Sequence, residues 1–261
     1  YIPVISLNLA GLESHPGFKL TLPMLHRLFY GIIYGDMLLS LVNQCKPYEK
    51  NKGQTESLAN ELTALLANKM QTEGISFKKV KQNCKMILSR FAEIPRENEE
   101  KVKVGVVGEI YVKYSPLGNN NLEQFLIDEG AEVVVPGLLD FFMYCIVSNI
   151  SDIELYGLHK IRKPVLNFVF GYLQKQQNEI IELMKTDGNF TPPTPIAHTM
   201  DLIKDFMGFG TKMGEGWLLP AEMLELNDEG VHNIVCTQPF GCLPNHICGK
   251  GMMKPLKEKN P

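Results

Sequence analysis

The chain has 261 residues, a net charge of -3 and a pI of about 6.1, which argues against the nucleic-acid-binding class, whose members usually carry a basic face. Hydrophobic residues make up 44% and charged residues 21%, as is typical of a globular protein with a buried core. The longest apolar run, Leu138 to Val147, is interrupted by Asp140 and is shorter than the ~18 residues of a membrane-spanning helix. We therefore expect neither a nucleic-acid partner nor a membrane partner.

The ends of the chain and its cysteines bear on its origin and compartment. The first residue is Tyr1 rather than Met, and the chain stops after a helical pattern, where an α/β protein would normally begin another strand. We therefore expect a piece of a longer protein. Tyr1 to Pro3 lacks the basic start of a signal peptide, so the six cysteines favour a reducing, cytoplasmic compartment over a disulfide framework.

The first hundred residues are predicted to be mainly helical after one strand. Residues 1–9 are apolar and rich in Ile and Val, so they predict a buried strand, and we assign residues 1–11 to the end of a preceding α/β domain. Residues 12–100 form the predicted helical segment. Its first helix, over residues 22–42, is expected to bury one face made of Leu25, Leu28, Phe29, Ile32 and Ile33.

Two more helices are predicted after a polar loop over residues 46–53. Leucines at helical spacing from Leu58 to Leu66 predict the first of them, with a stop near Gly74. Ser76 is the predicted N-cap of the second, whose apolar face is Phe77, Val80, Cys84, Ile87, Leu88 and Phe91. Pro95 and the charged residues after it mark a boundary, so the helical segment is expected to end near residue 100.

Residues 101–261 have the alternating pattern of an α/β domain that is cut at its C-terminus. Three buried strands are predicted, over residues 102–108, 132–136 and 233–237. The expected helices are one capped by Asn120, then 138–148, 155–185 with a division at Pro164, 223–227 and 249–258. Because strands that alternate with helices form parallel sheets, we predict a Rossmann-like α/β fold preceded by a mostly helical segment.

The loops after the three predicted strands form the candidate ligand site. They begin at Gly108, at Pro136 and at Gln238. Ligands of open parallel sheets bind beyond the carboxyl ends of the strands, and a parallel sheet would bring these loops to one edge. Glu109 and the residues from Tyr111 to Tyr114 are expected to form a solvated loop there.

The cysteines in the C-terminal part do not form a known metal motif. Cys236, Cys242 and Cys248 are spaced by six residues, which matches neither the zinc pattern nor the bacterial ferredoxin pattern. Cys242 follows Gly241 in the loop after the third strand, where its sulfur could point into the crevice. His246 could be a metal ligand, a hydrogen-bond donor to a cluster sulfur or an ordinary surface histidine. The remaining cysteines are expected to be packing residues: Cys45, Cys84, Cys145, Cys236 and Cys248.

The sequence lacks the common nucleotide-binding and hydrolase motifs. It contains no Walker A sequence, no H-E-x-x-H and no G-x-S-x-G, and the glycines around Val106 do not form a dinucleotide fingerprint. Glycine-rich stretches at 208–210 and 214–216 are interpreted as turns, with contact to a phosphate as the alternative. We therefore expect no ATP binding by this chain.

Several segments resemble one protein family. Residues 104–123 (VGVVGEIYVKYSPLGNNNLE), residues 212–219 (KMGEGWLL) and residues 238–246 (QPFGCLPNH) are similar to the large activase-type proteins associated with 2-hydroxyglutaryl-CoA dehydratase, the CoA-substrate-specific enzyme activase family. Residues 20–23 and 47–49 are similar as well, so the resemblance covers nearly the whole chain.

The resemblance implies a role beside an ATP-hydrolysing activase module, in the region similar to the dehydratase component. In related dehydratase subunits, cysteines from two α/β domains hold a [4Fe–4S] cluster, and Cys242 is the matching residue here. The other ligands would lie upstream, outside this chain. Gly241 and the amides after Cys242 are the expected hydrogen-bond donors to the cluster sulfur, whereas Cys248 stands where relatives are expected to carry a small aliphatic residue.

The chemistry implied by the resemblance is ATP-driven electron transfer at low potential, from the cluster to a 2-hydroxyacyl-CoA thioester or another small molecule, through a ketyl radical. Two other functions stay open. One is a non-catalytic interaction or scaffold domain of a larger reductase, with Cys242 merely buried and no cluster of its own. The other is a small-molecule-binding domain of the periplasmic-binding type, kept in the cytoplasm. Incorporation of a cluster into the longer protein would separate the first function from both of these.

Overall fold

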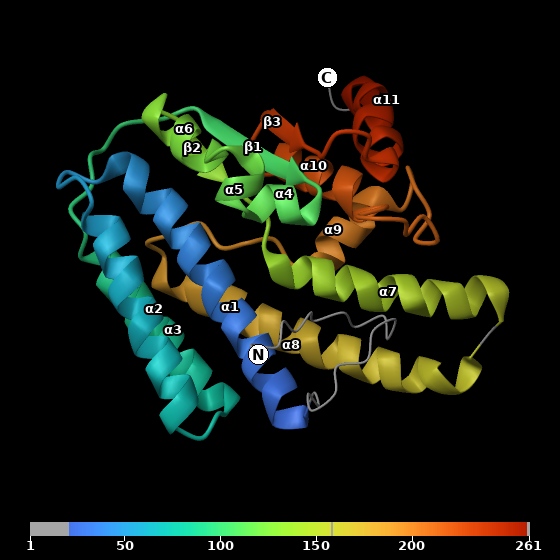
Figure 1. Ribbon diagram of the computed structural model, residues 1–261, viewed down its shortest axis with the longest axis horizontal. Coiled ribbons are helices and arrows are strands. Elements are labelled where there is room, and N and C mark those ends of the chain that lie inside the picture. Colours follow the sequence, from blue (N-terminus) through green and yellow to red (C-terminus); the bar gives the residue numbers. More distant parts are fainter. Residues whose placement is uncertain (1–20, 158, 260–261) are drawn as a thin grey trace, which may run out of the picture.

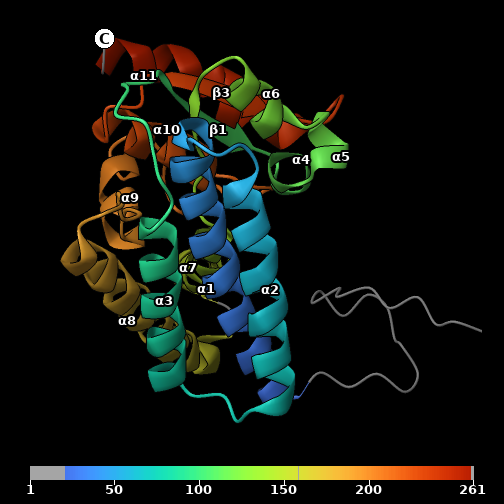
Figure 2. The same cartoon turned by 90° about the vertical axis from the view of Figure 1, so that its left-hand side faces the viewer.

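The computed structural model describes residues 21–157 and 159–259. The strand predicted over residues 1–9 and the domain assigned to residues 1–11 lie outside these described residues. Figures 1 and 2 show a small sheet with several short helices on one side of the molecule and long helices on the other. Helices account for most of the described residues, so the parallel sheet is the smaller part of an α/β fold.

The sheet has three strands, β1 (Lys103–Gly108), β2 (Glu132–Val134) and β3 (Asn233–Thr237), in the order β2-β1-β3. Both pairings are parallel, which confirms the predicted α/β class. Gly108 pairs with Thr237, so the carboxyl ends of β1 and β3 meet at the same edge. The second strand is shorter than predicted, because residues 135 and 136 have already left the sheet.

The long helices of the first part are α1 (Leu22–Cys45), α2 (Gln54–Thr72) and α3 (Phe77–Ala92). The predicted N-cap of α3 is confirmed, since the backbone N of Lys79 donates to Oγ of Ser76 at 3.4 Å. The residues between α1 and α2 were predicted to be a polar loop, but they begin with a 3-10 turn over Lys46–Tyr48. The carboxylate of Glu49 then accepts hydrogen bonds from the backbone N of Gly53 and of Thr55.

The predicted buried face of α1 is partly wrong. Leu25 is 39% exposed and Leu28 is 37% exposed, although both were expected in the core. The helix contacts α2, α3, α7 and β2, and most of the residues that it buries lie in its second half. The residues that it buries are Tyr30, Ile33, Tyr34, Met37, Leu38, Leu41, Asn43 and Cys45.

The helices of the middle of the chain divide at a different point from the one predicted. Helix α7 (Leu138–Tyr156) ends at Gly157, which adopts a left-handed φ of 69°, and α8 (Lys163–Asp187) follows. Pro164 lies in the first turn of α8 rather than between two halves of one helix. A proline is tolerated there because the first turn has no intrahelical partner for its N–H groups.

The shorter helices also refine the predictions. Helices α4 (Ile110–Tyr114), α5 (Pro116–Asn119) and α6 (Leu122–Asp128) lie between β1 and β2. The cap of α6 comes from Asn119 rather than Asn120, since Oδ1 of Asn119 accepts from the N of Leu122 at 3.1 Å. Asn120 and Asn121 both have a φ of 57°, which keeps them outside the helix. The region with the candidate site therefore begins with more helix than the sequence predicted.

The C-terminal part has two helices before the last strand, α9 (Ile196–Ile203), which was not predicted, and α10 (Leu218–Asp228). After β3 the chain forms a π-helical turn at Asn245–Gly249, a 3-10 turn at Lys250–Met252 and α11 (Met253–Lys259), in place of one regular helix. One continuous hydrophobic core joins α1–α3 to α7, α8 and α10. Among the described residues, no helix combines the length and apolar character that crossing a membrane requires.

Candidate functional site

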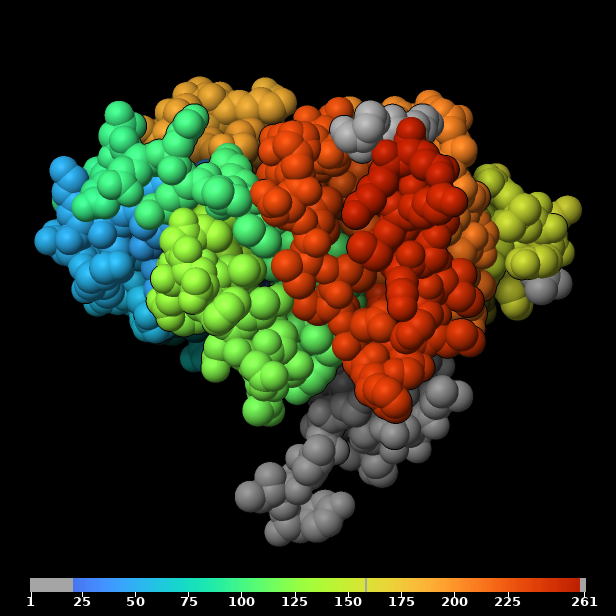
Figure 3. Space-filling view, turned by 90° about the horizontal axis from the view of Figure 1, so that it is seen from above, coloured from blue at the N-terminus to red at the C-terminus, as the bar shows by residue number. Residues whose placement is uncertain are grey.

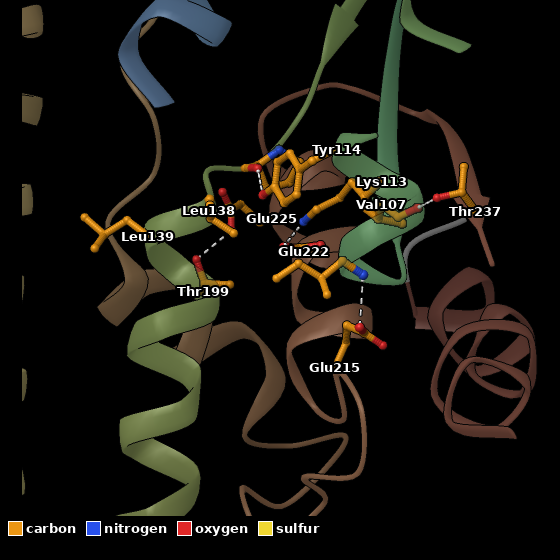
Figure 4. Close-up of polar contacts among 12 residues, drawn as sticks. Val107, Lys113, Tyr114, Leu138, Leu139, Thr199, Glu215, Glu222, Glu225 and Thr237 are labelled. Carbon is orange, nitrogen blue, oxygen red and sulfur yellow. Dashed lines mark hydrogen bonds and ion pairs between the residues drawn. The ribbon is translucent and has the colours of Figure 1, made fainter. Parts of the chain in front are cut away.

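The carboxyl ends of β1 and β3 are joined by unusually close backbone contact. Gly108 has a φ of 141°, and a Cβ atom at this position would lie 2.0 Å from the carbonyl oxygen of Thr237. The backbone N of Glu109 donates to that same oxygen at 3.0 Å, and Oγ1 of Thr237 donates to the carbonyl of Val107 at 3.2 Å (Figure 4). These contacts fix where the loop after β3 leaves the sheet.

The loop predicted after β1 is a helix instead. Oε2 of Glu109 accepts from the backbone N of Val112 at 2.8 Å, so Glu109 caps α4. Lys113 is only 3% exposed, although it was expected to be solvated. The hydroxyl of Tyr114 donates to the carbonyl of Pro136 at 2.6 Å, which ties α4 to the end of β2. The prediction of a solvated loop was wrong because these residues form a helix that buries Lys113, although Tyr111 stays 60% exposed.

Lys113 forms a buried ion pair with Glu222 of α10. Its Nζ lies 2.7 Å from Oε1 of Glu222, and the two side chains are 4% and 3% exposed (Figure 4). Burial raises the pKa of Glu222, and the Lys113 charge opposes that shift. Nearby, Oε1 of Glu215 accepts from the backbone N of Ile110 at 3.0 Å, so the turn before α10 also holds the start of α4.

Further buried carboxyl groups lie between the sheet and the long helices. They line a cavity of about 130 Å³ together with residues of β2, α1, α7 and α8. Both oxygens of Asp36 accept, from the backbone N of Leu138 and of Leu139, and burial raises the pKa of Asp36 to about 6. Burial raises the pKa of Asp140 to about 7, although its Oδ1 accepts from Nε2 of Gln177 at 2.6 Å. Burial therefore favours the protonated form of both carboxyl groups.

Cys242 lies in a tight turn directly after β3. Gly241 has a left-handed φ of 74°, and the backbone N of Cys242 donates to the carbonyl of Pro239 at 3.3 Å. The cysteine is half-buried. Nδ2 of Asn245 donates to the sulfur at 3.2 Å, and Asn245 itself is 0% exposed. The structure thus places Gly241 and Cys242 at the predicted edge of the sheet.

His246 lies close to Cys242 but contacts its backbone. The ring Nδ1 lies 2.9 Å from the carbonyl oxygen of Cys242 and 3.4 Å from Nε2 of Gln238. The imidazole is exposed. The His246 ring therefore contacts the carbonyl of Cys242 and Gln238, whereas the hydrogen bond to the Cys242 sulfur comes from Asn245.

The other cysteines lie where packing was expected. Cys84 and Cys248 are buried, and Cys236 is half-buried within β3. Burial raises the pKa of Cys84 to about 12 and that of Cys236 to about 11, which keeps both as neutral thiols. Within the described ranges, no group of three or more His, Cys, Asp or Glu side chains is arranged to hold a metal ion.

Several apolar residues near Cys242 in the chain are exposed on the surface. Phe240 and Leu243, on either side of the cysteine, are fully exposed and 68% exposed, and Met213 and Ile247 are also exposed. Gly214 brings the turn of Met213 against this loop, since a Cβ at Gly214 would lie 2.8 Å from Cβ of Pro244. Figure 3 shows the C-terminal segments, in orange and red, spread over one face of the molecule.

Sequence reasoning missed the half-buried Asp36 and the buried residues Asn245, Glu215 and Glu222, and it wrongly expected Lys113 to be solvated. Lys113, Glu215 and Asn245 lie within the segments that carry the family resemblance. Asp36 and Glu222 are charged residues within otherwise apolar stretches of helix, and that was the signal that could have identified them.

Comparison of the chain with models of protein families, with curated proteins and with solved structures gives no match.

Proposed function

We propose that this chain is part of an iron–sulfur redox protein of the 2-hydroxyacyl-CoA dehydratase and activator type. In this proposal Cys242 is one ligand of a [4Fe–4S] cluster. The protein takes part in ATP-driven electron transfer at low potential to a CoA thioester or another small molecule, and an activase module supplies the electron. We also propose that the protein is cytoplasmic and that its three-stranded parallel sheet belongs to a Rossmann-like fold.

The observation that carries this proposal is the position of the Cys242 sulfur. Cys242 lies in the loop that follows the carboxyl end of the parallel strand β3, where ligands of such sheets bind, and the residue is half-buried. The other five cysteines lie within helices, in β3 or in the π-helical turn that follows. Cys242 is therefore the cysteine best placed to reach a group that another protein segment also holds.

The residues around Cys242 suit one shared ligand rather than a complete cluster site. Among the described residues, no group of three or more His, Cys, Asp or Glu side chains is arranged to hold a metal ion, so further ligands would come from elsewhere. When bound, a [4Fe–4S] cluster takes up and passes on single electrons. The residues of this chain would hold one corner through the Cys242 sulfur and donate a hydrogen bond to that sulfur from Asn245.

The proposal is tested by cluster content. The full-length protein is purified without oxygen, and its iron, acid-labile sulfide and visible spectrum are compared with those of Cys242→Ala after cluster reconstitution. Cys145→Ala is the matched control, because Cys145 is also half-buried but lies in α7. We expect the cluster in wild type and in the control, and its loss or destabilisation in Cys242→Ala.

The opposite result would favour the alternative function. Well-folded full-length wild type without iron would show that Cys242 is not a cluster ligand. The chain would then be better described as a non-catalytic interaction or scaffold domain of a larger reductase, and the exposed apolar residues around Cys242 would be its most plausible contact surface.

A further inference from the structure

The cavity between the sheet and the long helices combines carboxyl groups with apolar side chains. It has a volume of about 130 Å³ and lies along β2, from Glu132 at the start of that strand to Pro136 just beyond its end. A volume of this size has room for about ten water-sized groups, so a small organic molecule fits into it. Apolar side chains of α1, α7 and α8 form part of the lining: Ile33, Met37, Leu139, Ile180, Ile181 and Met184.

Two carboxyl groups of the lining, those of Asp140 and Glu225, each have one oxygen to spare. The two residues are 5% and 6% exposed. Oδ1 of Asp140 accepts from Nε2 of Gln177, and Oε2 of Glu225 accepts from the hydroxyl of Thr199, both at 2.6 Å (Figure 4). No described residue donates a hydrogen bond to the second oxygen of either group. Because a buried acceptor without a donor costs stability, these two oxygens favour a ligand that brings donors.

The lining of the cavity is strongly acidic. Lys103 is the single cation among the described lining residues, and its Nζ lies 3.6 Å from Oε1 of Glu132, at the start of β2. Burial raises the pKa of Glu225, and the negative charge of Asp140 raises it further, so these two carboxyl groups repel each other when both are ionised. A cation between them would relieve this repulsion. The acidic residues of the lining are Asp36, Glu132, Asp140, Glu225 and Glu229.

We propose that this cavity binds a small alkylamine, whose ammonium group donates to the free oxygens of Asp140 and Glu225 and whose alkyl chain lies against the apolar lining. An ammonium group has donors and no acceptor, which matches two acceptors that lack donors. The apolar part of the lining, for example Ile180 and Met184, favours an organic cation over a metal ion, which would need more oxygen ligands. Neither Cys242 nor its loop lines the cavity, so this site does not depend on the iron–sulfur function.

Isothermal titration calorimetry with 3-methylbutylamine tests the site, with 3-methylbutan-1-ol as a neutral probe of the same shape. We expect saturable binding of the amine to wild type, and binding of the alcohol at least about tenfold weaker. Asp140→Asn and Glu225→Gln each keep an oxygen for Gln177 or Thr199 but remove the charge, so each should weaken amine binding at least about tenfold. Glu215→Gln is the matched control, because Glu215 is 7% exposed but does not line the cavity, and it should leave the affinity unchanged.

Three results would overturn the proposal: no saturable binding of the amine to wild type at millimolar concentrations, equal affinity for the alcohol, or unchanged affinity in both carboxyl variants. A measurement on wild type alone keeps the test decisive if those variants do not fold. In the ¹H–¹⁵N NMR spectrum, addition of the amine should shift the side-chain amide signal of Gln177, which donates to Asp140. Shifts confined to surface residues outside the cavity would show that the amine binds elsewhere.

Discussion

The ammonium group of Lys113 and the carboxylate of Glu222 lie 2.7 Å apart, and both side chains are almost completely buried (Figure 4). The pair joins α4, which follows β1, to α10, which packs on the same strand. It therefore connects the carboxyl edge of the sheet to the core beneath it. Burial raises the pKa values of the nearby Asp36 and Asp140, and the charge of Lys113 opposes this rise.

Removal of one partner of this pair should be costly. Lys113→Met leaves the Glu222 carboxylate buried without its cation, so we expect the free energy of unfolding to fall by about 3–5 kcal/mol. Denaturation by urea measures this loss. The double variant Lys113→Met, Glu222→Leu should recover most of the stability, because it leaves no unpaired charge. A double variant no more stable than Lys113→Met would mean that the side chains act through packing rather than charge.

Gly108 should tolerate no side chain. In Gly108→Ala the new Cβ would overlap the carbonyl oxygen of Thr237, so we expect a loss of at least about 3 kcal/mol in the free energy of unfolding. Gly130→Ala is the control, because Gly130 also has a positive φ, of 89°, but open space around its Cβ. That change should cost only about 1 kcal/mol. Equal losses in the two variants would mean that backbone strain, not the contact between β1 and β3, sets the cost.

Stability should fall as the pH rises toward the alkaline side of neutrality. Burial raises the pKa of Asp36 to about 6 and of Asp140 to about 7, whereas both ionise near 3.8 in the unfolded chain. Between the unfolded-state and the folded-state pKa values, the folded protein therefore binds more protons than the unfolded chain. Its stability decreases as the pH rises through the folded-state pKa values. The neighbours of Asp140 are Asp36 and Glu222, which raise its pKa further, and Lys113, which lowers it.

Thermal unfolding between about pH 5 and pH 8 measures this dependence. In wild type we expect the free energy of unfolding to be about 1–3 kcal/mol lower at pH 8 than at pH 5. Asp140→Asn keeps an oxygen to accept from Gln177 but cannot ionise, so its stability should vary less with pH. Asp128→Asn, at an exposed position, should leave the slope of wild type unchanged. A slope in Asp140→Asn as steep as that of wild type would show that other groups dominate.

The hydroxyl of Tyr114 should hold the end of β2 in place. Tyr114→Phe removes its hydrogen bond to the carbonyl of Pro136 and leaves that carbonyl without this donor, so we expect a loss of about 1–2 kcal/mol. Tyr111→Phe, a change to a tyrosine of the same helix that is 60% exposed, should have little effect. Urea denaturation of both variants tests this, and equal stability of the two would show that the hydroxyl of Tyr114 contributes nothing.

Local sequence patterns determined much of this fold. The strands over residues 103–108 and 233–237 were predicted almost to the residue, because short runs rich in Val and Ile favour buried strands whatever surrounds them. The helix capped by Ser76 was predicted for a similarly local reason, since the cap and the apolar face lie within the segment itself. The parallel arrangement followed from the alternation of strands and helices.

Only the tertiary structure decided which polar residues are buried. Lys113 has the appearance of a surface residue in sequence, and its burial depends on Glu222, which lies 109 residues later in the chain. In the same way, Asp36 caps the start of α7 from another helix, 102 residues before Leu138. The sequence by itself determined where β1 and β3 end and that Cys242 follows β3. The partners that hold those ends come from distant segments, and a pattern read along the chain contains no information about which distant segments will meet.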